Sequence, residues 1–138
     1  MKNWKPTAAA AATVALAVLM GTPGGEAPYA QQAALKRTIL QRGDLSVQGR
    51  EVVMAVAEVP PGAAAGKHTH PGEEVSYVLE GSLVLEVAGK PPKTFKAGDV
   101  FMVPAGTVHD GKNTGAGTAK VLATYIVEKG KPLATPAP

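Results

Sequence analysis

Short apolar segments, each ended by glycine or proline, are the feature that most restricts the fold of this 138-residue chain. The turn signals recur roughly every 8–12 residues, which is the spacing of strands in all-β domains. No stretch between them is long and periodic enough for a helix, because glycine and proline interrupt every candidate. We therefore expect a single all-β domain, a sandwich or a closed barrel, in place of an α/β fold.

The expected strands follow from these segments. They cover residues 38–40, 51–59, 74–79, 83–87, 93–96, 100–103 and 119–127. Glu80 and Gly81 separate two of them closely enough to predict a tight hairpin. The segment 51–59 (EVVMAVAEV) is apolar at both odd and even positions, so we expect both of its faces to be covered. One face would line the interior and the other would meet a second sheet or subunit, which favours a homodimer.

The first thirty residues have the layout of a secretory signal peptide. Lys2 and Lys5 precede an uncharged apolar run at residues 7–20, and a small, polar stretch with proline and glycine ends at Ala30. The run is too short for a comfortable membrane span. We expect cleavage near Ala30, export to the periplasm or the extracellular space, and no stable membrane insertion afterwards. The alternative is an uncleaved leader that tethers the domain to the membrane.

The remainder of the chain divides into three expected parts. Residues 31–50 form an N-terminal arm with a short strand, and residues 51–128 form a single barrel domain. Residues 129–138 are rich in proline, alanine and lysine and form an extended tail on the surface.

Composition excludes several classes of partner and site. Loss of Lys2, Lys5 and Glu26 with the leader lowers the formal net charge from +3 to +2, and the remaining basic residues are scattered. A nucleic acid is therefore not an expected partner. The chain has no cysteine, which excludes disulfides, cysteine-type zinc sites and iron–sulfur clusters. A metal ion would have to be bound by nitrogen and oxygen atoms.

The three histidines are placed as metal ligands would be. His68 and His70 are two residues apart, so on a strand both imidazoles point to the same face. His109 follows about forty residues later, beyond a Pro-Ala-Gly turn. Glu73 and Glu74 offer a carboxylate at the start of the next strand. Three neutral imidazoles and one carboxylate make a site for a first-row divalent ion with one or two open positions.

Glycine and proline frame these ligands in two strings with fixed spacing. The first reads Gly62, five residues, His68, one, His70, three, Glu74, six, Gly81; the second reads Gly98, five residues, Pro104, one, Gly106, two, His109, three, Asn113. Both strings match the two signature motifs of the cupin superfamily, and the resemblance spans residues 51–127.

The resemblance to cupins implies a six-strand β-barrel core, usually extended to a jelly roll. The resemblance also implies that His68, His70, Glu74 and His109 are the metal ligands, because they stand at the ligand positions of the motifs. Glu74, and not Glu73, has the spacing that the motif requires. The glycines and prolines of the motifs would be scaffold, with Gly62 and Gly81 at turns of positive φ. Asn113 would be a turn residue. Of the neighbours of the ligands in the sequence, Lys67 would be a surface charge, Tyr77 an aromatic side chain used in packing, and Asp110 a carboxylate in a turn.

The function is less constrained than the site. The ion could be Mn, Fe, Zn, Cu or Ni, and the fold hosts many activities. The first hypothesis is a metal-dependent enzyme, of oxygenase, oxidase or lyase type, on a small organic substrate. We expect its cavity to be apolar, with Met54, Phe101 and Met102 supplying bulk. No catalytic residue can be assigned.

Two alternatives remain. The domain could bind a metal ion or a small molecule without turnover, because no general base stands out beyond the ligands. A sugar isomerase or epimerase is the weakest hypothesis, because it would need further ionisable groups or an arginine in the pocket, and no arginine follows Arg50.

Overall fold

The structure is a computed structural model that describes residues 34–138. Within this range the chain forms ten strands and no helix, so the all-β prediction is confirmed. The described part accordingly contains no helix that is long and apolar enough to cross a membrane. The predicted signal peptide lies outside the described residues.

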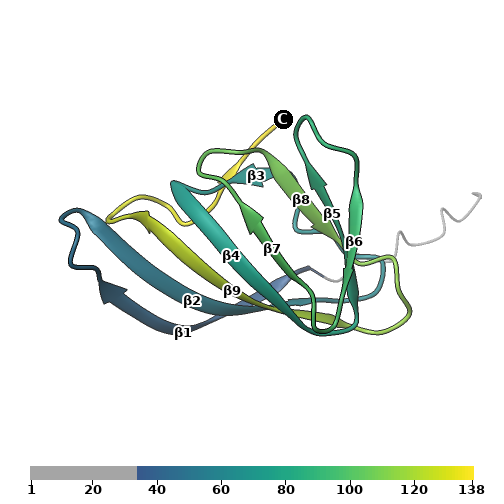
Figure 1. Cartoon of the computed structure of the whole chain (residues 1–138). Helices are drawn as coiled ribbons and strands as arrows, with labels where there is room; N and C mark the ends of the chain where they lie inside the picture. Colours follow the sequence, from purple (N-terminus) through teal and green to yellow (C-terminus); the bar gives the residue numbers. More distant parts are fainter. Residues whose placement is uncertain (1–33) are drawn as a thin grey trace, which may run out of the picture. The chain divides into compact units, whose positions relative to one another are not determined.

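Two five-stranded antiparallel sheets face each other (Figure 1). The first sheet has the order β1 (Lys36–Asp44), β2 (Arg50–Val59), β9 (Ala119–Glu128), β4 (Gly72–Glu80) and β7 (Val100–Val103). The second has the order β10 (Thr135–Pro136), β3 (His68–Thr69), β8 (His109–Lys112), β5 (Ser82–Val87) and β6 (Lys93–Lys96). The prediction of a tight hairpin at Gly81 is wrong: the chain turns there from β4 to β5, but the two strands belong to different sheets and do not pair with each other.

Both ends of the described chain contain more structure than the apolar pattern predicts. β1 has nine residues, although the pattern indicates a strand only at residues 38–40. It pairs along β2 with an irregularity between Ile39 and Gln41. β10 pairs with β3, and the amide of Ala137 donates to the carbonyl of Lys67 at 2.9 Å. Pairing with a neighbouring strand, which local propensity does not encode, stabilises both segments.

The interior between the sheets follows the strict alternation of the strands. In β2, Val53, Ala55, Ala57 and Val59 are buried, while the residues that alternate with them are only partly covered. In β7, Phe101 points inward and packs on Phe95 at 5.1 Å between ring centroids.

The same alternation corrects two expectations about the cavity. Met54 lies on the outer face of β2, and Met102 is 58% exposed on the outer face of β7. Neither can line the interior, because residues one position apart on a strand point to opposite faces. The prediction for Phe101 is confirmed.

Gly72 sets how closely β4 approaches β9. A Cβ at this position would lie 2.0 Å from the carbonyl oxygen of Ile126, which belongs to the backbone and cannot rotate away. Only glycine permits this approach. Because Gly72 begins the strand that carries Glu74 two residues later, the close packing also positions that carboxylate.

We expect Gly72→Ala to lower the free energy of unfolding by about 2 kcal/mol or more, since the Ile126 backbone must move. Urea denaturation measures the change. Gly43→Ala is the matched control, because Gly43 also lies in a strand of the first sheet but has no positive φ and no atom within 4 Å of the place that a Cβ would take. Equal losses in the two variants would contradict the close-approach argument.

Candidate metal centre

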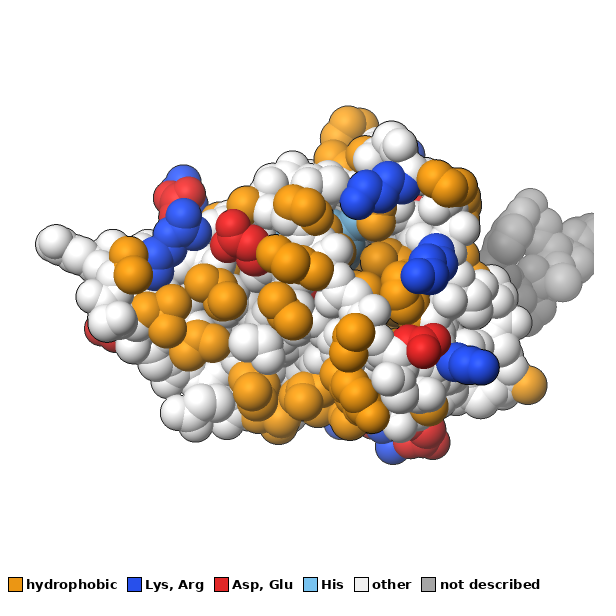
Figure 2. Space-filling model, viewed as in Figure 1, with side chains coloured by type: hydrophobic (Ala, Val, Ile, Leu, Met, Phe, Trp, Pro, Cys, Tyr) orange, Lys and Arg blue, Asp and Glu red, His pale blue; other side chains and the backbone are white. Residues whose placement is uncertain are grey.

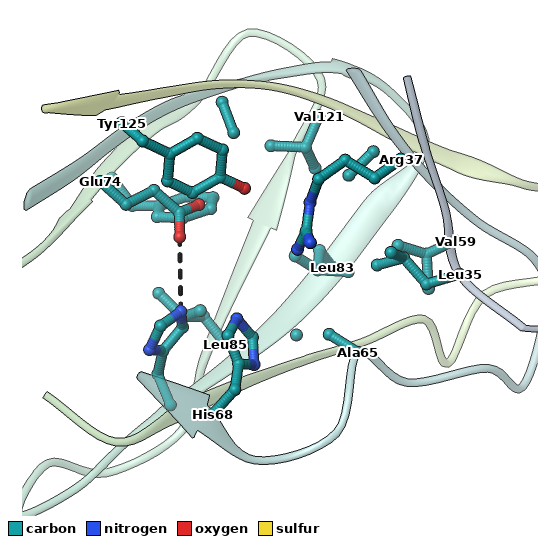
Figure 3. Close-up of a pocket in the computed structure, with 15 residues that line it drawn as sticks. Leu35, Arg37, Val59, Ala65, His68, Glu74, Leu83, Leu85, Val121 and Tyr125 are labelled. Carbon is teal, nitrogen blue, oxygen red and sulfur yellow. Dashed lines mark ion pairs between the residues drawn. The ribbon is translucent and has the colours of Figure 1, made fainter. Parts of the chain in front are cut away.

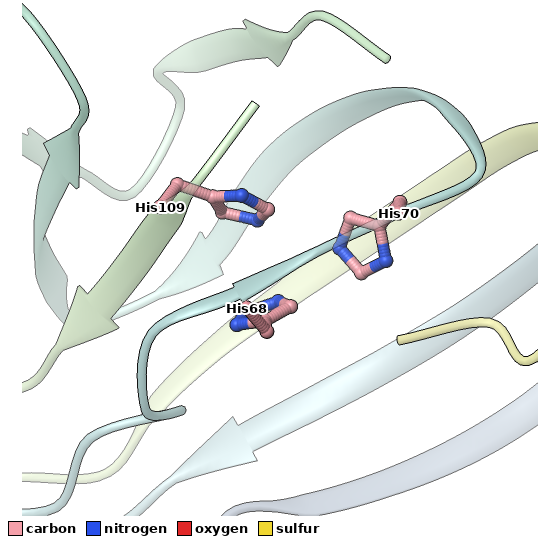
Figure 4. Close-up of side chains that lie close together, drawn as sticks. All are labelled: His68, His70 and His109. Carbon is pink, nitrogen blue, oxygen red and sulfur yellow. The ribbon is translucent and has the colours of Figure 1, made fainter. Parts of the chain in front are cut away.

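Two strands that are far apart in sequence bring the three histidines together (Figure 4). His68 in β3 is paired directly with His109 in β8, and His70 follows β3 on the same face. The ring centroids lie 4.3 to 5.0 Å apart, and one nitrogen from each ring lies within 4.8 Å of the other two. All three residues are buried. The structure thus unites the three imidazoles that the spacing predicts.

Backbone carbonyls hold all three rings in one tautomer. The Nδ1 atoms of His68, His70 and His109 lie 2.6, 2.5 and 2.9 Å from the carbonyl oxygens of Gly66, Leu133 and Thr107. A carbonyl can only accept, so each neutral ring carries its proton on Nδ1. The lone pair of every Nε2 is then free for a metal ion, which is the arrangement seen when a second hydrogen bond orients a ligating histidine.

The oxygen that orients His70 comes from the C-terminal segment, 63 residues further along the chain. The side chain of Leu133 also packs against the buried cluster that contains Val53, Tyr125 and Val127. The segment is therefore fixed to the core at the point where its carbonyl meets the imidazole. The prediction of an extended tail does not include this contact, because nothing in a Pro- and Ala-rich sequence indicates it.

Glu74 completes a set of three nitrogens and one oxygen. Its Oε2 lies 3.0 Å from His70 Nε2 and 3.3 Å from His109 Nε2. The dashed line in Figure 3 marks the contact with His109. Two ligand atoms at right angles around an ion, each bound at about 2.1 Å, are about 3 Å apart. The hydroxyl of Ser76 donates to Oε1 at 2.6 Å and fixes the carboxylate. Glu73 points to the outer face of β4 and is not part of the group.

The donor atoms of this group lack other partners. His70 Nε2 and His109 Nε2 are buried, and neither makes a hydrogen bond of good geometry within residues 34–138. Buried polar atoms are nearly always hydrogen-bonded, and exceptions are found at ligand sites. The donor set, its spacing and its unpartnered nitrogens therefore fit a first-row divalent ion.

The surroundings of the group shift the pKa values of three of the four proposed ligands. Burial lowers the pKa of His68, and the two neighbouring rings lower it further. Burial alone would raise the pKa of Glu74, but the close imidazoles of His109 and His70 and the hydroxyl of Ser76 prevail and hold it well below its usual range. Burial would likewise lower the pKa of His109, yet the Glu74 carboxylate and the Thr107 carbonyl raise it. Glu74 is thus an anion at neutral pH.

A cavity of about 40 Å³ adjoins His68, Glu74 and His109. It has room for about three waters. Its walls are mostly apolar, but Arg37 from β1 and Tyr125 from β9 also face it (Figure 3). Alternation along β9 is a signal that could have found Tyr125, since it places the ring on the same face as the buried Val121 and Ala123. No such signal exists for Arg37, because its neighbours in β1 show no apolar alternation.

The remaining motif residues are scaffold. Gly62 and Gly81 have φ of 74° and 72°, as predicted for turns that need glycine. Asn113 is buried; its side-chain amide donates to the carbonyls of Val59 and Gly117, and its oxygen accepts from the Gly115 amide. These bonds confirm its role in a turn.

The sequence predicts three neighbours of the ligands outside the site. Lys67 is exposed, and Tyr77 lies 44% exposed on the outer face of β4, with no contact to the centre. Asp110 corrects the prediction of a turn carboxylate, because it lies within β8 and is buried.

Comparison with known proteins supports the resemblance found in the motifs. The family described as Cupin domain matches residues 55–125. A germin-like protein of Arabidopsis thaliana (subfamily 2 member 2) is 43% identical over 79 residues, which cover 54% of this chain and 36% of the relative. The oxalate-binding protein of Thermotoga maritima is 38% identical over 76 residues, covering 54% of this chain and 62% of that protein. The chain thus spans about a third to three-fifths of the length of these relatives.

A solved structure shows the same fold. Recombinant oxalate oxidase in complex with glycolate superposes with a TM-score of 0.60 at 22% identity, covering 74% of this chain and 54% of the other. At this identity the likeness concerns the arrangement of strands alone.

The His109–Glu74 contact predicts a pH dependence for protein stripped of metal by a chelator. The raised pKa of His109 stabilises the fold below about pH 6.5 and loses that effect as pH rises through the folded pKa. The lowered pKa of Glu74 stabilises the fold above about pH 4.5 and loses that effect as pH falls. We therefore expect the metal-free protein to have its highest Tm between these values, measured by calorimetry in EDTA. Glu74→Gln should flatten this maximum, and an unchanged profile would contradict the pairing.

Proposed function

The chain belongs to the cupin family, and from that premise we propose that it binds one divalent transition metal ion through His68, His70, His109 and Glu74. The proposal includes a small organic acid as the ligand that meets the ion in the adjoining cavity. The observation that carries it is the convergence of three unprotonated Nε2 atoms and one carboxylate oxygen, none needed for hydrogen bonding elsewhere in the described chain. Mn, Fe, Zn, Cu and Ni all suit this donor set.

The size and lining of the cavity support a small acid as the ligand. The part of the cavity beside the ligands, about 40 Å³, favours a small ligand over a sugar, which disfavours the isomerase or epimerase hypothesis. An isomerase or epimerase would need an arginine in the pocket, and the described cavity does contain one, Arg37. This residue belongs to β1, which precedes both motifs in the sequence. One relative of this chain is named for binding oxalate, the smallest dicarboxylate, and this supports the same class of ligand here.

We favour a metal-dependent enzyme of oxidase, oxygenase or lyase type. Bound at the four ligands, the ion would supply Lewis acidity or redox chemistry at its open positions. The imidazoles of His68, His70 and His109 and the anionic carboxylate of Glu74 would hold the ion, and the apolar wall at Leu83, Leu85 and Phe101 would limit the access of water to the ligand.

A non-catalytic binding module is the second candidate, and one observation favours it. Beyond the proposed metal ligands, the ionisable residues that line the described cavity are Arg37 and Tyr125. Burial raises the pKa of Tyr125 to about 12, and arginine stays protonated, so neither is a general base at neutral pH. Product formation from a small organic acid by the metal-loaded protein would separate the two candidates, since a binding module forms none.

Metal analysis tests the central proposal. We expect about one ion per chain in protein from its native compartment or after reconstitution, and almost none in the variant His68→Ala/His70→Ala, which lacks two of the four ligands. Elemental analysis after gel filtration measures the content. Lys67→Ala is the matched control, because the residue is exposed and adjacent to the ligands. A metal-free unmutated protein, even after reconstitution, would refute the proposal.

We also propose that a second copy of the chain covers the outer face of the first sheet. Six large apolar side chains are exposed there, on β4, β7 and β9: Val75, Tyr77, Leu79, Val100, Met102 and Ile126. Figure 2 shows hydrophobic side chains gathered over β4 and β7 on this face, with little charge among them. Patches of this kind are uncommon on monomers, and a two-fold interface would bury the same patch on both copies.

We expect a dimeric mass in light scattering for the unmutated protein and a monomeric mass for Met102→Glu, because a carboxylate would be buried without a partner at the interface. Thr94→Glu serves as the control on β6, away from this face, and should leave the mass unchanged. A monomer for the unmutated protein, or a dimer for Met102→Glu, would contradict the proposed interface.

Export is part of the proposal and rests on the pattern of residues 1–30, which the structure does not describe. Intact-mass measurement of the native protein decides it, since an unprocessed N-terminus in the cytoplasm would refute export.

A further inference from the structure

Arg37 is the one positively charged side chain among the residues that line the cavity. It projects from β1 toward the space between Tyr125 and His68 (Figure 3). Its guanidinium carbon lies 5.8 Å from the centroid of the Tyr125 ring, within reach of a cation–π contact. The lining therefore places a cation opposite the proposed metal ligands.

This guanidinium has no anionic partner. In the described part of the chain, no carboxylate lies within 4.0 Å of it, and its Nε is buried without a hydrogen bond. The other basic side chains of β1 are paired: Lys36 lies 3.3 Å from Glu58 and Arg42 3.6 Å from Glu51. Arg37 is half-buried, but the N–H of its Nε is enclosed and has no acceptor in the fold, so the contrast leaves this group available to a partner from outside the fold.

The charges around the cavity define that partner. With a divalent ion bound, the ion would contribute two positive charges and Arg37 one, while a ligating Glu74 carboxylate would contribute one negative charge and ligating imidazoles none. Two positive charges then remain inside apolar walls, where charges interact strongly. A dianion would balance them, and a monoanion would not.

Solvent can reach the guanidinium without passing through the core. A shallow hollow of about 250 Å³ shares Leu35, Arg37, Ala65 and His68 with the cavity and continues past Pro136 of β10. A small ligand entering there would meet Arg37 and His68 together.

We propose that Arg37 is the specificity-determining residue of the cavity and binds one carboxylate of a small dicarboxylate whose other end faces the three histidines. Arginine suits this task because its planar fork of donors matches the two oxygens of a carboxylate. The inference rests on the proposed function and goes further by naming the charge of the ligand and the residue that selects it.

Oxalate and oxamate provide the test. They have nearly the same shape, but oxamate carries an amide in place of one carboxylate. We expect the metal-loaded protein to bind oxalate at least about tenfold more tightly than oxamate in calorimetric titrations, because a charge-assisted pair is about twice as strong as a neutral one. Arg37→Gln should reduce this preference to nearly one at unchanged metal content. Arg37→Lys should retain part of it, since the charge is kept and the fork is lost.

Lys36→Gln is the matched control, because it removes the same charge from the neighbouring residue of β1, which points to solvent. It should keep the full preference for oxalate. Thermal unfolding of each variant identifies any loss of fold, and Arg37→Lys carries the test if Arg37→Gln does not fold.

The outcomes separate this inference from the proposed function. An unchanged oxalate preference in Arg37→Gln, with metal and oxalate still bound, would overturn the role of Arg37 alone. Failure of the metal-loaded unmutated protein to bind either acid would overturn the proposed ligand class and the inference with it.

Discussion

The centre depends on one short antiparallel pairing, in which His68 of β3 lies opposite His109 of β8. This register places both imidazoles on the same face of the second sheet at neighbouring positions. Because side chains alternate along a strand, a shift of one residue would turn one ring away from the other. β3 has only two residues, so its position is held mainly by what surrounds it: β10 on one side and β8 on the other.

The burial of the centre has an electrostatic consequence as well as a structural one. Apolar walls at Leu83, Leu85 and Phe101 strengthen every charge interaction inside the cavity, because little water is present to screen them. The same walls would make an unbalanced charge costly. A site of this kind discriminates ligands by charge more sharply than an exposed site with the same residues.

The sequence predicted the parts of the structure that short-range spacing encodes. The strand pattern and the framing glycines identified the fold class, and the spacing of His68, His70 and Glu74 identified residues that the structure brings together with His109. Alternation along β7 also predicts that Met102 points away from the interior, because it lies one position after the inward-facing Phe101.

What could not be predicted depends on contacts between distant segments. The partial burial of Arg37 follows from the pairing of β1 with β2, and β1 has no apolar alternation that would reveal its inner face. The contact of Leu133 with His70 joins residues 63 positions apart and uses a backbone oxygen, which every residue possesses. No side-chain pattern can encode such a contact.

The hydrogen bond from His70 to Leu133 makes the C-terminal segment an energetic partner of the ion. Coupling between two equilibria is reciprocal, so an ion that requires one orientation of His70 also favours the docked segment, and docking favours the ion to the same degree. A tag fused to Pro138, next to a strand of only two residues, would therefore lower the affinity of the centre for the ion if it displaced the segment that orients His70.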